Sequence, residues 1–397
     1  MKYIAKMMLA LLASVTLVIP AYAWDFSASG SMSAKWEQST TKADADSDAI
    51  TSANFSSASG GVSLKSNHTD GDKTLGLTYS VDVDTDGTQS TGSDDTAGSA
   101  GLDQTLSLAG SVKVGKWTAS ATASQSLMED GVTSKISADD DGAITLTDGS
   151  ITYKLGDASH LSTAEKVADT TADGSSETDA EARVDGFNGF SVGLGAGPGT
   201  LTVALDMHSN SSGGAYSALG EEEAGLADAV GCGGQVTAFG FNFAGNVGAD
   251  LSVTYGSGSW AASSTGCTGD NASNSASSST LGLGVAVPVG AMTIGLDFES
   301  SSYNGKAAGS DLKGTKGGTQ VSVAMGGIAD GTVTAVFASN SSKVGDGDAA
   351  ARTGMELGWK TSVGAASLEV AYGSWSDNEA GGEDSASDIE IEMSLSF

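Results

Sequence analysis

The feature that most constrains the fold of this chain is a strict two-residue alternation of side-chain polarity. In the first such segment, every second residue from Trp24 to Trp36 is aromatic, Ala, Gly or Met, and the residues between them are Asp, Ser and Lys. The last segment alternates in the same way from Ile389 to Phe397. Because successive side chains of a strand point to opposite faces, each segment predicts a β-strand with one apolar and one hydrophilic face.

The spacers between the alternating segments are short and long in turn. Turns rich in Gly, such as Asp148-Gly149, alternate with polar stretches such as 84–101, 157–186 and 301–318. This rhythm is typical of antiparallel hairpins whose long loops all lie at one rim. The segments predict about 18 strands, with 16 as the alternative, in one domain.

A wide barrel explains the alternation and the composition together. The chain has 56 Gly and only 3 Pro, and its hydrophobic residues amount to 39%. A sheet in lipid must close on itself because no backbone polar group can stay unpaired there. With 16–18 strands the interior is too wide for side chains to fill and holds water. We therefore expect an all-β transmembrane antiparallel barrel with short periplasmic turns and long external loops; a soluble sandwich with a dry core is the alternative.

The first 23 residues read as an export signal. Lys2 and Lys6 form a basic start, residues 7–20 are an apolar stretch, and Ala21-Tyr22-Ala23 matches the small-x-small pattern of a cleavage site. The apolar stretch is shorter than the roughly 20 residues of a spanning helix. We expect residues 1–23 to be cleaved and residues 24–397 to form the single barrel domain.

The charge balance and the motifs exclude several functions. The chain carries 49 acidic against 18 basic residues, so it is not suited to bind the phosphates of nucleic acid. The three histidines, His68, His160 and His208, lack metal-ligand spacing, and no nucleophile elbow, phosphate loop or CxxC pair is present. We therefore expect no catalytic residues, no metal site and no cofactor. We expect Asp-rich stretches such as 139–141 to be solvated loop tips. Weak binding of divalent cations at these loops is the alternative.

The two cysteines, Cys232 and Cys267, both fall in predicted loops. In an oxidising envelope they would form one disulfide between loops. Two unconnected thiols remain the alternative.

Three stretches of the chain resemble the general diffusion porins of Gram-negative outer membranes. They are WDFSASGSMSAKW after the signal, the tight hairpin GAITLTDGSITYKLGDAS at 142–159, and the terminal strand IEIEMSLSF. The resemblance implies a bacterial outer-membrane channel, often a homotrimer, surrounded by lipid and lipopolysaccharide. It also implies that the loop after the hairpin folds into the lumen as a constriction, and that the barrel-assembly machinery reads Phe397 as its signal.

The chain departs from this family in two respects. The family usually has 16 strands, whereas this sequence has an additional hairpin at 102–127, so either the barrel is larger or that segment does not span. The family also lines its constriction with Arg facing carboxylates. After residue 23 only Arg183 and Arg352 remain here, which puts a basic wall in doubt.

The candidate site residues follow from the resemblance and from strand parity. By parity we mean whether a residue lies on the apolar or on the hydrophilic face of its alternating strand. The predicted constriction loop is 157–186, and its charged residues are Asp157, Glu165, Asp169, Asp173, Glu177, Asp179, Glu181, Arg183 and Asp185. The hydrophilic parity of the strands predicts these lumen-facing charges: Lys35, Lys65, Lys113, Lys154, Asp206, Asp297, Glu299, Glu356, Lys360, Glu369, Glu390 and Glu392.

The excess of carboxylates in both sets predicts a porin for small hydrophilic solutes and ions that prefers cations. Two alternatives stay open. The first is an extracellular structural or surface-layer β-protein, and the second is a substrate-specific outer-membrane channel.

Overall fold

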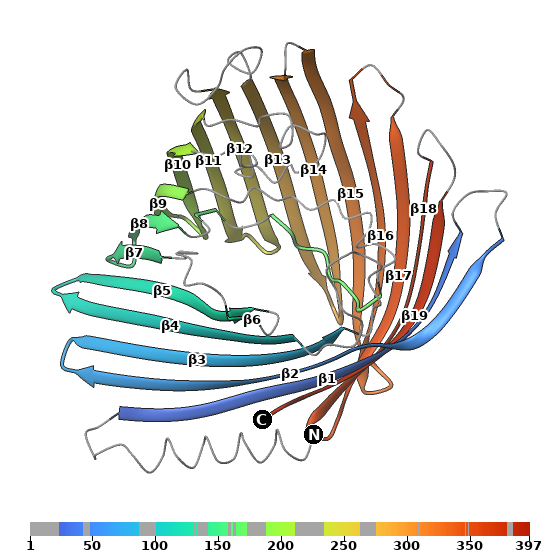
Figure 1. Cartoon of the computed structure of the whole chain (residues 1–397), viewed down its shortest axis with the longest axis horizontal. Helices are drawn as coiled ribbons and strands as arrows, with labels where there is room; N and C mark the ends of the chain where they lie inside the picture. The colour runs from blue at the N-terminus through green and yellow to red at the C-terminus, as the bar shows by residue number, and fades with distance from the viewer. Residues whose placement is uncertain are drawn as a thin grey trace.

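The computed structural model consists of antiparallel strands (Figure 1). It describes residues 24–42, 48–86, 101–129, 132–133, 142–157, 160–161, 164–172, 188–210, 234–262, 275–307, 310–345, 347, 349–378 and 384–397. The strands of the first half are β1 (Trp24–Lys42), β2 (Ile50–Asp70), β3 (Lys73–Asp86), β4 (Gly101–Val114), β5 (Trp117–Glu129), β6 (Val132–Thr133), β7 (Gly142–Thr147), β8 (Ile151–Asp157), β9 (Asn188–Ala196) and β10 (Gly199–Asn210). Those of the second half are β11 (Gly234–Asn246), β12 (Asp250–Ala262), β13 (Ser275–Val289), β14 (Met292–Ala307), β15 (Ser310–Ile328), β16 (Gly331–Val344), β17 (Ala350–Val363), β18 (Ala366–Asp377) and β19 (Ser385–Ser396).

The strands form one closed wall. Each strand except the short β6 pairs with the next along the chain, and β1 pairs with both β2 and β19. The two-residue β6 pairs only with β5, which continues the wall by pairing with β7, so the barrel has 18 strands. The predicted barrel and its predicted strand number are confirmed.

The hairpin at 102–127 is part of the wall. β4 pairs with β3 from Gly101 to Val112, and β5 pairs with β7, so both strands continue the barrel. This hairpin therefore raises the strand number above the 16 of the resembling family.

One predicted loop is wrong. Residues 301–318 were expected to be a long spacer, but β14 and β15 stay paired through them up to the pair Ala307 and Ser310. The physical reason is that the ladder is made of backbone hydrogen bonds. Above the bilayer both faces of a hairpin touch water, so polar side chains there no longer mark the end of a strand.

Burial along the strands is the reverse of that in a soluble protein. On β14, Ile294, Leu296 and Phe298 are 38%, 41% and 39% exposed, whereas Asp297 and Glu299 are 0% and 6% exposed. The apolar stripe therefore lies on the outer face, and the acidic stripe lies on the inner face. The alternative of a sandwich with a dry apolar core is wrong.

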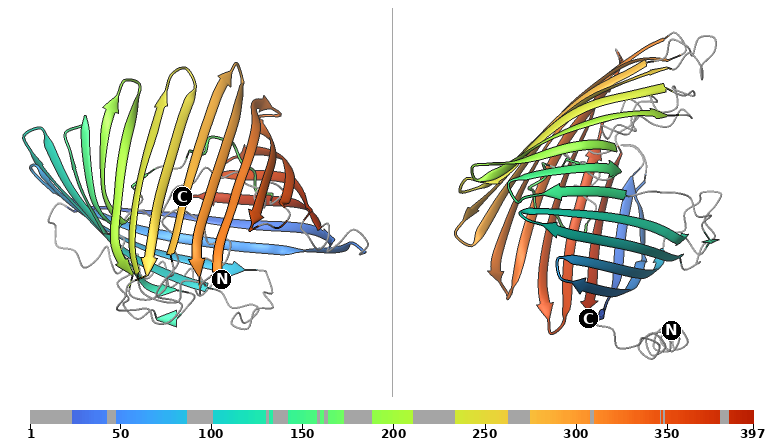
Figure 2. Two further views of the ribbon diagram at one scale, coloured as in Figure 1. Left: turned by 90° about the horizontal axis from the view of Figure 1, so that it is seen from above. Right: turned by 90° about the vertical axis from the view of Figure 1, so that its left-hand side faces the viewer.

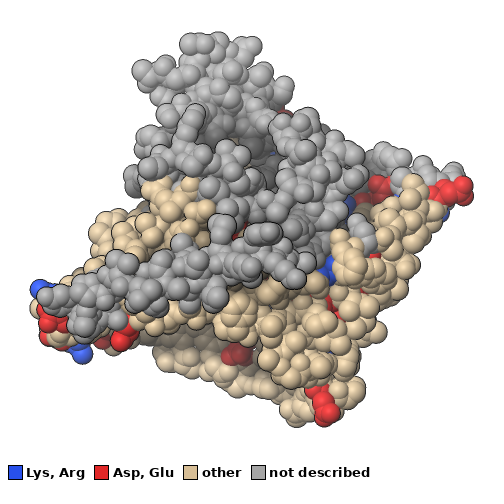
Figure 3. Space-filling model, turned by 60° about the horizontal axis from the view of Figure 1, so that its bottom comes forward, with Lys and Arg blue, Asp and Glu red and all other residues tan. Residues whose placement is uncertain are grey.

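The outer surface agrees with this arrangement. On the face seen in Figure 3, uncharged residues make up most of the described surface, Lys, Asp and Glu gather toward its left and right ends, and a few charged residues lie between them. An outer face with many exposed apolar side chains suits the hydrocarbon layer of a bilayer. Within the described part of the chain, we find no helix with the length and hydropathy needed to cross a membrane.

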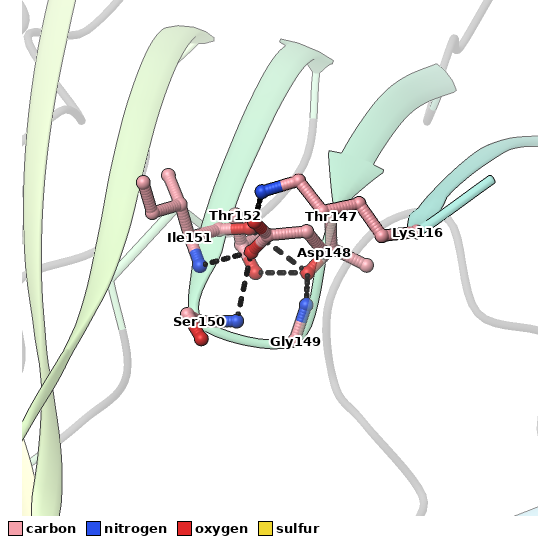
Figure 4. Close-up of polar contacts among 7 residues, drawn as sticks. All are labelled: Lys116, Thr147, Asp148, Gly149, Ser150, Ile151 and Thr152. Atoms are coloured by element: carbon pink, nitrogen blue, oxygen red, sulfur yellow. Dashed lines mark hydrogen bonds and ion pairs between the residues drawn. The ribbon is translucent and has the colours of Figure 1, made fainter. Parts of the chain in front are cut away.

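Tight turns close the hairpins at one end of the barrel (Figure 2). The turn between β7 and β8 is held by Asp148, which accepts 2.9 Å hydrogen bonds from the amides of Ser150 and Ile151 (Figure 4). Lys116, from the neighbouring β4–β5 turn, donates to its other oxygen at 2.7 Å. The hydrogen bond from Lys116, together with those from the two amides, lowers the pKa of Asp148 to about 2. The carboxylate thus joins two adjacent turns, and Gly149 supplies the positive φ of 88° that the turn needs.

Candidate functional site: a segment bound to the inner wall

A chain segment between β8 and β9 leaves the wall and runs inside the barrel (Figure 1, green). Its described residues, 160–161 and 164–172, contact strands far away in the sequence. Leu161, Ala164, Val167 and Ala172 are all buried. We call residues 160–172 the inward segment, of which 162 and 163 are not described.

His160 attaches the beginning of the inward segment to the wall. One ring nitrogen lies 2.8 Å from the Gly156 carbonyl oxygen of β8, and the other lies 2.9 Å from the hydroxyl of Ser191 on β9. His160 is only 6% exposed. With one nitrogen donating to the carbonyl and the other accepting from the hydroxyl, both polar atoms of a neutral imidazole are satisfied.

Asp297 of β14 is the strongest attachment point. Its Oδ1 and Oδ2 atoms accept from the Lys166 amide at 2.8 and 2.9 Å, and Oδ2 also accepts from the Val167 amide at 2.8 Å. Hydrogen bonds to an ionised acceptor are shorter and stronger than neutral ones. A buried carboxylate thus satisfies two backbone donors that have no strand partner.

Three further strands continue the attachment. The Ala168 amide donates to the Ser322 hydroxyl of β15 at 2.8 Å, and the Thr171 amide donates to Glu369 of β18 at 3.2 Å. Thr170 donates to Glu356 of β17 with its amide at 3.2 Å and its hydroxyl at 2.7 Å. The inward segment therefore crosses the inner face of β14–β18 and is held there by side chains of the wall.

Glycines of the wall make room for the segment. A Cβ atom at Gly284 would overlap the carbonyl oxygen of Ala164. A Cβ at Gly295 would lie 2.8 Å from the Val167 Cα atom, and one at Gly358 would lie 2.9 Å from the Thr170 Cγ2 atom. All three glycines lie on the inner parity, so they form a shallow groove in which the segment backbone fits against the wall.

The structure describes three of the predicted constriction charges. Glu165 and Asp169 belong to the inward segment and are exposed, and Asp169 Oδ1 accepts a 2.8 Å hydrogen bond from the Thr170 amide. Asp157 is the last residue of β8. Asp173, Glu177, Asp179, Glu181, Arg183 and Asp185 lie outside the described residues.

The predicted lumen charges lie on the inner parity, and some of them pair. Across four adjacent strands, Lys360, Glu369, Glu392 and Lys35 are direct register partners. Lys360 donates to Glu369 at 2.9 Å, and Lys35 donates to Glu390 at 2.9 Å. The two lysines therefore have local carboxylate partners on the wall.

The other predicted lumen residues are distributed around the barrel. Glu299 is buried and accepts from the Ser301 hydroxyl at 2.9 Å. Asp206 on β10 is fully buried, Lys154 on β8 is half-buried, and Lys65 and Lys113 are exposed. The described charges of both signs thus line the inner face, and the carboxylates concentrate where the inward segment is attached.

Residues with no charge contribute to the site and were not among the predicted site residues. Ser322, Thr170 and the glycines of the groove belong to this group, and His160 was considered only as a metal ligand. Their parity was readable in the sequence, but their contact with a segment more than a hundred residues away was not.

The described residues contain no group of three or more His, Cys, Asp or Glu side chains that could hold a metal ion. Cys232 and Cys267 both lie outside the described residues, as does the predicted signal at 1–23. The predictions for the disulfide and for the signal therefore stay predictions.

Comparisons with known proteins give structural matches only. No protein-family model matches the chain, and no curated protein matches it by sequence. A loop-deletion form of the outer membrane protein OmpT of Vibrio cholerae matches with a TM-score of 0.48 and 10% identity, over 95% of this chain and 100% of that chain. An anion-selective porin from Comamonas acidovorans gives 0.48 and 10%, over 94% and 100%. OpdL from Pseudomonas aeruginosa gives 0.48 and 9%, over 94% and 99%.

The arrangement of the wall itself decides the location. A closed antiparallel barrel with apolar residues outside and carboxylates inside pairs the backbone groups of neighbouring strands with each other, as lipid requires. The chain is a β-barrel of the bacterial outer membrane.

Proposed function

We propose that this barrel is a porin, a water-filled channel for passive diffusion of small hydrophilic solutes and ions, without catalytic activity. The observation that carries the proposal is the inward segment, which is hydrogen-bonded to one side of the inner wall of an 18-strand barrel. A barrel of this size is too wide for wall side chains to fill. A segment fixed to one side narrows the passage.

The proposed channel is selective for cations. Glu165 and Asp169 are exposed on the inward segment, while Lys35 and Lys360 are paired with carboxylates of the wall. Fixed negative charge in a narrow channel with low-dielectric walls attracts cations and repels anions. The inward segment therefore acts as the constriction, and its exposed carboxylates act as the selective groups.

Planar-bilayer recording tests both parts of this proposal. Purified protein should insert as discrete conductance steps, and a salt gradient should give a reversal potential of cation-selective sign. The double variant E165Q/D169N should keep the conductance steps and shift the reversal potential toward zero. A matched control, D70N at the last residue of β2, should leave it unchanged. Absence of conductance steps would overturn the channel, and an anion-selective wild type would overturn the cation preference.

The resemblance of the sequence to general diffusion porins supports a homotrimer in contact with lipid and lipopolysaccharide, assembled by the barrel-assembly machinery. Chemical cross-linking of native outer membranes should give a trimer band that disappears on heating in detergent. A monomer band alone, at cross-linker concentrations that trap a known trimeric porin in the same membranes, contradicts this assembly.

A further inference from the structure

A pocket at the end of the wall away from the tight turns is not used by the proposed constriction. It is lined by residues of β1, β2, β18 and β19 and has a volume of about 460 Å³, which lies in the usual range of roughly 300–1,000 Å³ for small-molecule sites. The lining residues are Thr41, Lys42, Asp48, Ile50, Trp375, Asp384, Ser385 and Ala386.

The floor of the pocket lies on the lumen parity and is apolar except for the hydroxyl of Thr41. Trp375 pairs in register with Ala386, Ala386 with Thr41, and Thr41 with Ile50, so these residues form one row across four strands. Ile50 is 71% exposed. A Trp beside small residues and an exposed Ile presents a flat apolar surface to water, which is unexpected on a wall otherwise rich in hydroxyls and carboxylates.

The indole of Trp375 is held in place by a chain of contacts. The Arg352 guanidinium lies 4.7 Å from the ring centroid, and Arg352 donates to Asp377 at 3.0 Å. Asp377 is 8% exposed, and its other oxygen accepts from the Asp384 amide at 3.3 Å. Arg352 and Asp377 thus fix the aromatic ring before any ligand arrives, which reduces the entropy cost of binding.

Polar groups surround this apolar floor. Asp48 and Asp384 offer carboxylate acceptors and Thr41 offers a hydroxyl, whereas Lys42 and Ser385, which pair with each other in register, lie on the opposite face of the wall at the pocket's edge. A ligand that fits must therefore combine a flat apolar face with donors and acceptors around its edge. Because the Arg352 guanidinium already lies against one face of the indole, that face is not open to a cationic ligand.

We propose that this pocket binds neutral saccharides at the entrance of the channel, with a sugar ring stacked on Trp375 and its hydroxyls donating to Asp48 and Asp384. The C–H face of a pyranose is apolar and its rim is hydroxylated, which matches the pocket. The inference adds a solute class to the proposed channel and rests on that function.

Maltose, a neutral disaccharide, is the probe. Titration of the detergent-solubilised barrel with maltose should change its tryptophan fluorescence with saturation, and maltose on the external side should interrupt the single-channel current. W375A should weaken both effects about tenfold or more, and D48N should weaken them severalfold. W359F is the matched control, since Trp359 lies on the outer parity and donates to the Ile328 carbonyl. It should leave both effects unchanged.

The outcomes separate the two proposals. Heat-modifiable gel migration first establishes that each variant is folded, and D48N, at an exposed residue, carries the test if W375A fails to fold. Conductance steps without any maltose effect would overturn the saccharide site and leave the channel intact. Loss of conductance steps in the wild type would instead overturn the channel. Saturable fluorescence change with choline but not with maltose, abolished by W375A, would overturn the saccharide class in favour of an organic cation.

Discussion

Thr170 donates two hydrogen bonds to Glu356, one from its amide and one from its hydroxyl, although the two residues are 186 positions apart in the sequence. The backbone of the inward segment has no strand beside it, so its donors need other acceptors. Carboxylates and a hydroxyl of β14, β15, β17 and β18 take that role. The wall therefore both forms the barrel and positions the segment inside it.

Removing the main attachment point should release the segment. D297A deletes an acceptor of three hydrogen bonds from two amides, and we expect it to weaken the attachment by about 2–4 kcal/mol. Single-channel currents should become larger and noisier. S322A, which removes a single acceptor, should have a smaller effect of the same kind. Equal, wild-type currents in both variants would contradict an attachment role for Asp297.

The glycine groove gives a steric test of the same contact. G284A places a Cβ onto the carbonyl oxygen of Ala164, and we expect the segment to shift, at a cost of about 1–3 kcal/mol. Proteolysis of the native protein at the inward segment should become faster. G110A is the matched control, because its Cβ would meet nothing closer than 4.0 Å. Proteolysis at the same rate in G284A and G110A would show that the groove is not needed.

The turn at Asp148 should make part of the folding stability of the barrel depend on pH. Its pKa is lowered in the folded state from 3.8 to about 2, so its stabilising contribution is complete above pH 4 and is lost as the pH falls toward 2. The thermal midpoint of the wild type should exceed that of D148N at neutral pH, and the difference should shrink between pH 4 and pH 2. K116M should reproduce part of the effect. A difference that stays constant down to pH 2 would contradict the lowered pKa.

The last residue closes the barrel in two ways that mutation can separate. Phe397 and Gly30 exchange backbone hydrogen bonds of 2.9 and 2.8 Å, and the Phe397 ring lies against Gly30. F397A keeps the backbone bonds, whereas deletion of Phe397 removes both, at about 0.5–1.5 kcal/mol each. Refolded in detergent, the deletion should be less stable than F397A.

In cells, both variants should reduce the amount of the heat-modifiable form in outer membranes if the Phe397 side chain is the assembly signal. A normal level of F397A would show that the side chain is not the signal.

Much of the architecture was predictable because it depends on local periodicity. The alternation from Trp24 to Trp36 and from Ile389 to Phe397 sets which side chains face lipid, and it predicted the first and last strands, which pair with each other as β1 and β19. The prediction failed at 301–318, where Ser, Gly and Lys continue the paired strands β14 and β15. Polarity marks the edge of the lipid there, whereas backbone pairing marks the end of the strand.

The site was predictable only as a set of inner-face charges. Parity placed Asp297, Glu356 and Glu369 on the hydrophilic face, but it could not show that they accept from the backbone of residues 166–171. Gly284 and Gly358 carry no periodic signal that separates a groove from an ordinary strand glycine. Those contacts require knowledge of which segment crosses the lumen.

The amino-acid sequence by itself determined the two-faced strands, their approximate number and the excess of acid on the inner face, because each of these follows from neighbours one or two positions apart. The tertiary structure alone decided the attachment of the inward segment to β14–β18, and the row that joins Trp375 to Ile50. These features depend on closing the wall, since only closure brings β1 and β2 beside β19 and places a distant loop against β14.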